Sequence, residues 1–149
     1  MSGEEHAERI ISARKEDSGQ REWQIRKGEI LKDGIPVFWS AFCKYLKSKA
    51  EGFNSKLGIT GDSSLQVYDC DSYVTLTKAQ LPKYIGKVTL IPSTRARIAT
   101  ETERVMRQPE FTTDDYLFDV RVDGTIELNG KDFHTLADDV FSAAAAFFR

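Results

Sequence analysis

The chain has 149 residues, of which 40% are hydrophobic and 30% charged, and its formal net charge is −2 at pH 7. This is the composition of one folded domain, and it excludes the disordered, collagenous and disulfide-rich classes. The longest uncharged apolar run, VFSAAAAFF, is far shorter than the roughly 20 residues of a membrane span. The N-terminal segment MSGEEHAERIISARKED lacks the apolar region of a signal peptide. The sequence therefore predicts a soluble, cytoplasmic protein that does not bind a membrane.

The residues that most often hold metals are few and scattered. Cys43 and Cys70 are 27 positions apart, and the only histidines, His6 and His134, lie near opposite ends of the chain. None of the Cys/His spacings of a zinc site is present, so no metal or other cofactor is predicted. Cys43 lies within a helical apolar pattern, where a cysteine packs as a small apolar residue.

The first third of the chain predicts two helical segments separated by a break. Residues 1–33 form a charged helical N-terminal extension, whose docking the sequence leaves open; an arm exchanged within a dimer is one arrangement. The segment KDGIP at 32–36 predicts the break, because Gly34 and Pro36 both disfavour a helix interior and Pro36 suits a first helical turn. Apolar residues then recur at three- and four-residue steps from Phe38 to Leu57, which predicts an amphipathic helix over 36–57.

From residue 64 the apolar period changes to two, which is typical of strands. Six short alternating segments lie within 64–128 and are separated by turn residues, so we expect an antiparallel sheet of five to six strands. The fourth segment, around 95–103, is also compatible with a helix. Residues 132–148 return to helical spacing with a wide apolar stripe, and Asp132 suits the N-cap.

Two hairpin registers follow from the apolar alternation. In LFDVRVDGTIEL, a three-residue loop with glycine at its last position sets Val120 opposite Ile126 and Phe118 opposite Leu128. In the first hairpin, the same argument sets Val67 opposite Val74 and Leu65 opposite Leu76, which leaves a four-residue loop from Asp69 to Ser72.

Asp69 and Asp71 are the most obvious candidates for chemistry. An apolar strand followed by DxD resembles the first motif of haloacid-dehalogenase-like phosphatases, a resemblance that implies a nucleophilic Asp69, a general acid at Asp71 and bound magnesium. That fold requires a helical crossover after the motif, whereas YVTLT follows here at once as a strand. We therefore interpret the two acids as part of a hairpin loop and predict no catalytic residue.

Three further side chains are candidates for interaction. Arg95 and Arg97 alternate along one face of the fourth segment, and residues 44–108 carry eleven Lys/Arg against six Asp/Glu. A solvated sheet face explains these charges; the alternative is weak nucleic-acid binding through 44–107, although no phosphate loop or RNA-binding signature accompanies them. Trp39 is either a partner-facing anchor or a core residue, and we favour the core.

These elements predict an α+β domain of order α-α-β-β-β-β-β-β-α, in two layers, with the helices on one face of the sheet. A charged N-terminal helix, a long helix with FW near its start and FN near its end, a strand meander and a C-terminal helix together resemble, in layout, small stand-alone bacterial proteins of unassigned activity. The first functional hypothesis is a non-enzymatic interaction module that binds a protein partner or a second copy. The alternative is a small-molecule carrier or enzyme using a cleft between sheet and helices, and nucleic-acid binding is the third.

Overall fold

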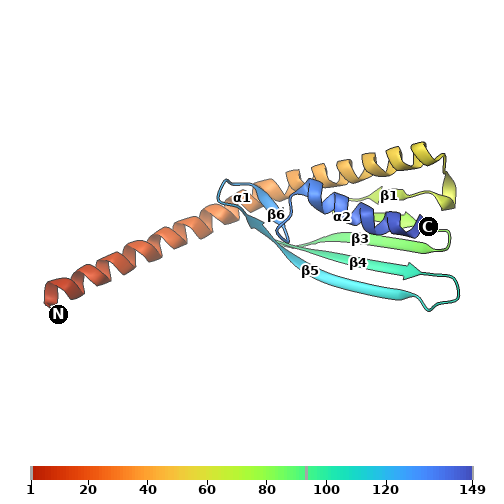
Figure 1. Ribbon diagram of the computed structural model, residues 1–149. Coiled ribbons are helices and arrows are strands. Elements are labelled where there is room, and N and C mark those ends of the chain that lie inside the picture. The colour runs from red at the N-terminus through yellow and green to blue at the C-terminus, as the bar shows by residue number, and fades with distance from the viewer. Residues whose placement is uncertain (1, 93, 149) are drawn as a thin grey trace.

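The computed structural model describes residues 2–92 and 94–148. One long helix precedes a meander of strands, and a shorter helix returns across the same face of the sheet (Figure 1). The elements are α1 (Gly3–Leu57), β1 (Gln66–Asp69), β2 (Tyr73–Lys78), β3 (Lys83–Ile91), β4 (Arg95–Glu103), β5 (Glu110–Val120), β6 (Ile126–Leu128) and α2 (Phe133–Ala145), with short 3-10 helices at Gly61–Ser63 and Ala146–Phe148.

The helix α1 is continuous over 55 residues, so the predicted break at 32–36 is wrong. Pro36 lies in its interior, where proline costs about 3 kcal/mol of helix stability. Tertiary packing offsets this cost, because buried residues lie on both sides of Pro36, at Leu31 and at Phe38. The predicted stop at Gly58 is confirmed: this residue has φ of 66° and closes the helix with its backbone N–H.

Gly34 also proves to have a packing role. A Cβ atom at this position would lie 2.0 Å from Cδ1 of Ile126 in β6. The glycine therefore allows β6 to approach α1 closely, and it does not end the helix.

The six strands form one antiparallel sheet in the order β1-β2-β3-β4-β5-β6, which confirms the predicted meander. The segment 95–103 is a strand rather than a helix. The fifth strand begins at Glu110 and is longer than the alternation from Tyr116 predicts. Its first half is paired with β4 throughout, and the hydroxyls of Thr100 and Thr112 hydrogen-bond across the pair.

One of the two predicted registers is right and the other is shifted. Val120 pairs with Ile126 and Phe118 with Leu128, as expected, and Gly124 adopts φ of 88° in the turn. In the first hairpin, Val67 pairs with Leu76 instead of Val74, and Asp69 pairs with Val74. The shift is two residues, so every side chain keeps its predicted face while the loop shortens to 70–72, closed by a hydrogen bond from the Cys70 N–H to the Tyr73 carbonyl.

Both helices pack on one face of the sheet and against each other, as the predicted α+β class requires. Aromatic rings join the elements: the Phe38 ring of α1 meets Phe118 of β5 at 5.4 Å, and Tyr84 of β3 meets Phe147 at 5.4 Å. The predicted helix 132–148 is confirmed, with Asp132 accepting a hydrogen bond from the Thr135 N–H as N-cap. The largest fully buried side chains are Phe42, Leu46, Leu65, Leu76, Leu128, Val74 and Val88.

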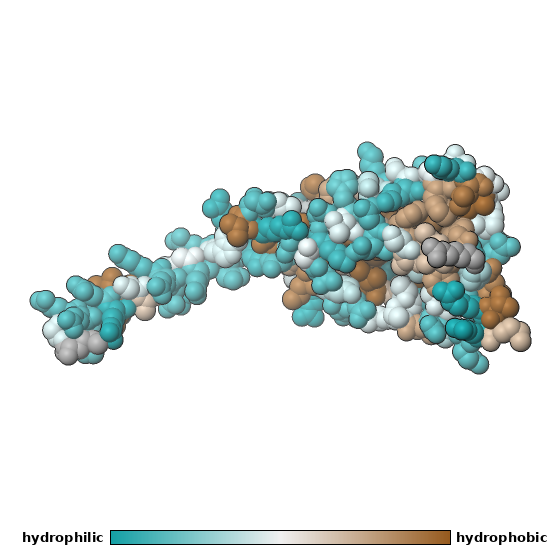
Figure 2. Space-filling model, viewed as in Figure 1, coloured by the Kyte–Doolittle hydropathy of each residue, from teal (hydrophilic) through white to brown (hydrophobic). Residues whose placement is uncertain are grey.

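The first part of α1, residues 3–26, extends away from the sheet, and we call it the arm (Figure 1). Every residue of the arm is exposed, and its surface is mostly hydrophilic with small, separate apolar patches (Figure 2). Contact with the rest of the chain begins at Lys27, which forms an ion pair with Asp119. Within the described residues, no helix combines the length and apolarity that crossing a bilayer requires.

Candidate interaction surface

The fifth strand has one edge that the described part of the chain leaves largely unpaired. β4 pairs with β5 along residues 110–117, whereas β6 pairs only with residues 118–120. Residues 110–117 therefore border open space on the side where β6 would continue, and we call them the open β5 edge. All of them are exposed except the half-buried Tyr116.

Hydrogen bonds at the end of β5 show which of its backbone groups face this edge. The Phe118 N–H donates to the Thr94 carbonyl on the β4 side at 2.9 Å, and the Arg121 N–H donates to the Thr125 carbonyl on the β6 side at 2.8 Å. Since successive residues of a strand direct their backbone groups to alternate sides, odd-numbered residues face the open edge. These residues are Phe111, Thr113, Asp115 and Leu117.

The edge is open because the chain turns away after β6. Asn129 and Gly130 both adopt the left-handed region, with φ of 53° and 74°. Leu128 and Lys131 exchange backbone hydrogen bonds of 2.9 and 3.1 Å, which closes a tight turn and directs the chain into α2. The turn therefore ends β6 before it can cover the rest of β5.

Charge on this strand is entirely acidic: β5 contains Glu110, Asp114, Asp115 and Asp119 and no Lys or Arg. Asp119 pairs with Lys27, and Asp115 accepts from Arg97 at 2.8 and 3.2 Å. The Arg97 guanidinium lowers the pKa of the Asp115 carboxyl through these hydrogen bonds.

Glu110 and Asp114 remain without an ion-pair partner within 4.0 Å among the residues that the structure describes. They lie on the same face of the strand, four residues apart. Within the described chain, the open edge therefore combines backbone groups that no strand pairs with and two carboxylates that no basic side chain pairs with.

Of the residues singled out from the sequence, Arg95 and Arg97 lie next to this edge. They project from the sheet face that the helices leave uncovered, and they pair in register with Leu117 and Asp115. Arg97 holds Asp115 in a fixed orientation by its two hydrogen bonds. Both arginines are exposed.

Asp69 and Asp71 lie at the other end of the strand order, in the β1–β2 hairpin. Asp69 ends β1 and Asp71 lies in the loop; both are exposed. Asp71 and Arg95 border a common hollow of about 240 Å³, together with Ser72 and Pro92. The structure thus brings Asp71 near Arg95 and leaves Asp69 apart from both arginines.

Trp39 is only 8% exposed, and its ring packs on Phe42 at 5.8 Å. This placement agrees with the interpretation of Trp39 as a core residue and removes it from the accessible surface. Cys43 is also buried, and desolvation, with a smaller effect of Asp69, raises the pKa of its thiol to about 12.

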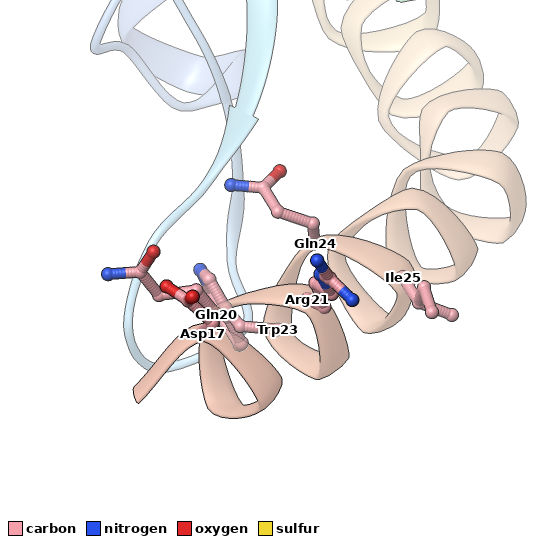
Figure 3. Close-up of a pocket in the computed structure, with 6 residues that line it drawn as sticks. All are labelled: Asp17, Gln20, Arg21, Trp23, Gln24 and Ile25. Carbon is pink, nitrogen blue, oxygen red and sulfur yellow. The ribbon is translucent and has the colours of Figure 1, made fainter. Parts of the chain in front are cut away.

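A small-molecule site requires convergent polar groups in an enclosed space, and the hollows that the described residues line lack that combination. Figure 3 shows one on the arm: all six lining residues come from 17–25 of α1, and their side chains spread along the helix without converging. A second, of about 520 Å³, lies between α1 and the β5–β6 turn and is lined mainly by Ile30, Val37, Phe38, Ile126 and Phe133. Within residues 2–92 and 94–148, no three His, Cys, Asp or Glu side chains are placed to hold a metal ion.

The basic residues of the 44–107 region are divided: Lys83, Lys87, Arg95 and Arg97 share the uncovered face of the sheet, whereas others are held in contacts within the chain. Lys78 is buried and donates to the carbonyls of Gln80 and Pro82 at 3.0 and 2.8 Å. Lys49 pairs with Asp138 between the helices, and the Arg104 guanidinium lies 4.4 Å from the Phe147 ring. Contacts within the chain therefore occupy several of the charges on which the nucleic-acid hypothesis depends.

The open β5 edge was missed in the sequence because EFTTDD contains two adjacent aspartates, which are depleted in strands. Phe111, Thr113 and Leu117 do follow a period of two, but in the opposite phase to the buried Phe118 and Val120, so the apolar alternation is not continuous along the strand.

Comparison with protein-family models, curated proteins and solved structures found no match to this chain.

Proposed function

We propose that this chain is a non-enzymatic interaction module that binds a partner by strand addition at the open β5 edge. One observation supports the proposal above all. No strand of the described chain pairs with the backbone N–H and C=O groups on the open side of Phe111, Thr113, Asp115 and Leu117. In strand addition, such groups supply hydrogen bonds to an extended peptide, and alternate side chains supply selectivity.

The surrounding side chains support this reading. Phe111 and Leu117 are 71% and 59% exposed, and both lie on the face bearing the side chains of Thr113 and Asp115. An added strand would cover these two apolar side chains and extend the sheet in the line of β6. The sheet is long enough here for an eight-residue partner, whereas the opposite edge strand, β1, has only four residues.

A pair of proline substitutions tests the proposal. The Thr113 N–H points to the open edge, so Thr113→Pro should leave the fold intact and block strand addition. The Thr112 N–H points to β4, so Thr112→Pro should lower the free energy of unfolding by about 1–3 kcal/mol, because a ladder hydrogen bond is lost. Thermal melting of both variants checks the predicted difference in stability.

Binding is then measured with three extended eight-residue peptides of β-forming composition: one basic, one neutral and one acidic. Backbone amide shifts confined to 110–117 and its β4 neighbours, present in wild type and absent in Thr113→Pro, are the expected result. If none of the peptides binds and Thr113→Pro leaves self-association in light scattering unchanged, strand addition at this edge is wrong.

A further inference from the structure

From the charge of the open β5 edge we infer the class of its partner: an extended segment of another protein that carries Lys or Arg at two positions four residues apart. This inference rests on the proposed strand addition and specifies what is added. Its basis is the pair of uncompensated carboxylates, Glu110 and Asp114, on one face of an edge strand that contains no basic residue.

The spacing of the two acids defines the pattern of the partner. Side chains four residues apart on a strand lie on the same face, so Glu110 and Asp114 would meet partner side chains that are also four residues apart. On the opposite face, Phe111 and Leu117 are exposed and would pack against apolar side chains. Asp115 requires no partner charge, because Arg97 already pairs with it.

The direction of the partner follows from β6. That strand is antiparallel to β5 and stops opposite Phe118, so a segment in the same line would begin opposite Leu117 and end opposite Glu110. Numbered along such a segment, apolar residues would occupy positions one and seven, and basic residues would occupy positions four and eight.

A second copy of this chain fits the edge less well than a basic segment. Two β5 edges can pair antiparallel in the register that sets Phe111 against Leu117 of the other copy. This register places the Asp114 carboxylates of the two copies directly opposite each other. Like charges directly opposite each other in a sheet are destabilising. Charged edge residues are also a recognised protection against self-pairing, and a basic partner reverses their effect.

The test uses the full chain and the peptide Val-Thr-Thr-Lys-Val-Thr-Val-Lys, with matched peptides in which glutamine or glutamate replaces both lysines. We expect the lysine peptide to bind tightest, with amide shifts over 110–117, and the glutamate peptide to bind weakest. The affinity of the lysine peptide should fall as the salt concentration is raised, because the charges that it pairs with are exposed and are screened by salt.

The substitutions Glu110→Gln and Asp114→Asn together should raise the Kd for the lysine peptide roughly threefold to tenfold. The control variant Glu51→Gln changes an exposed residue of α1 that is distant in the sequence from β5, and it should leave the Kd unchanged. Equal binding of all three peptides would overturn the inference and leave strand addition standing.

A concentration-dependent dimer that Thr113→Pro abolishes, with no peptide bound, would also overturn the inference by identifying a second copy as the occupant. Absence of both peptide binding and a Thr113→Pro-sensitive dimer would overturn the proposed function as well. The two failures are therefore distinguishable.

Discussion

Gly34 in α1 faces Ile126 in β6, and a Cβ at this position would overlap Cδ1 at the end of the Ile126 side chain, which would have to move. A glycine inside a helix costs about 1 kcal/mol relative to alanine, so this position gives up helix propensity for a close approach between two elements. Gly28, six residues earlier on the same helix, has nothing within 4 Å of the site where a Cβ would be placed. The two glycines thus separate the packing effect from the propensity effect.

We predict that Gly28→Ala raises the free energy of unfolding by up to about 1 kcal/mol, through helix propensity alone. Gly34→Ala should instead lower it by about 1 kcal/mol or more, because overpacking outweighs the same gain in propensity. Combining Gly34→Ala with Ile126→Val removes the clashing Cδ1 atom and should recover part of the loss. Chemical denaturation of the four proteins measures this; equal effects of the two alanines would contradict the packing role.

The two thiols differ in environment, and this difference is also testable. Cys43 is buried, with a pKa raised to about 12, whereas Cys70 is half-buried in the turn between β1 and β2. Because the thiolate is the reactive form, a thiol reagent at pH 8 should modify Cys70 and spare Cys43 until the protein is denatured. A Cys70→Ser variant should show no reactive thiol when folded and one when unfolded; rapid labelling of that folded variant would contradict the burial of Cys43.

The same shift predicts how this group affects stability at alkaline pH. The pKa of Cys43 is higher in the folded state than its ordinary value of 9.0, so unfolding releases a proton above that pH. Its contribution to stability is fully present below pH 9 and is lost as the pH rises towards 12. Cys43→Ala should therefore weaken the alkaline fall in the free energy of unfolding, measured by denaturation between pH 8 and pH 11, relative to wild type.

At the scale of elements, the two parts of the continuous helix α1 lie in different environments, one in solvent and one packed on the sheet. The arm, residues 3–26, is fully exposed and mostly polar, with only separate apolar residues, and a solvated helix of this kind is marginal by itself. Acidic residues precede arginines by four positions at Glu5, Asp17 and Glu22, an arrangement worth about 0.2–0.5 kcal/mol for each pair. The docked half, which contains Leu31 and Phe38, supplies the nucleus from which the arm extends.

We predict that deleting residues 2–24 changes the free energy of unfolding by no more than about 0.5 kcal/mol, because the arm makes no contact that the core requires. The control Leu31→Ala, at the start of the docked half, should cost about 2–5 kcal/mol. Amide exchange in the intact chain should slow progressively from Glu4 towards Leu31. A large loss of stability on deleting the arm would show that it contacts the rest of the protein.

At the scale of the whole molecule, the sheet is covered on one face by α1 and α2 together, and α2 closes the core. Leu136, Ala137, Val140, Ala144 and Phe147 are all buried, and Phe53 of α1 packs between the rings of Phe141 and Phe148 at 5.3 and 4.9 Å. Burial of the large apolar side chains of this segment contributes on the order of 10 kcal/mol before entropy. This is comparable to the total stability of a domain, about 5–15 kcal/mol.

Truncation after residue 131 should therefore prevent stable folding. The fragment 1–131 would expose the inner face of β2 and β3, including Val74, Leu76 and Val88, to water. Circular dichroism should show no cooperative thermal transition, and near-ultraviolet signals should be lost. A monomeric fragment that melts cooperatively would show that α2 is dispensable.

The sequence by itself determined the features that depend on local chemistry and on period. Alternation in the six strand segments assigned the faces of the sheet, Gly124 located one turn, and Asp132 and Gly58 located two helix ends. Apolar alternation repeats every two residues, however, so it assigns faces without selecting among registers that differ by two. That is why the β5–β6 register, located by Gly124, was correct and the β1–β2 register was not.

Only the tertiary structure decided the continuity of α1, the full length of β5 and the open β5 edge. The helix continues past Gly34 and Pro36 because Leu31 and Phe38 pack in the core. The strand continues past Asp114 and Asp115 because these residues pair with β4. The open edge depends on where the chain goes after Leu128, a turn that no residue of β5 specifies. Each is a relation between segments distant in the sequence, and propensity, which is local, contains no information about it.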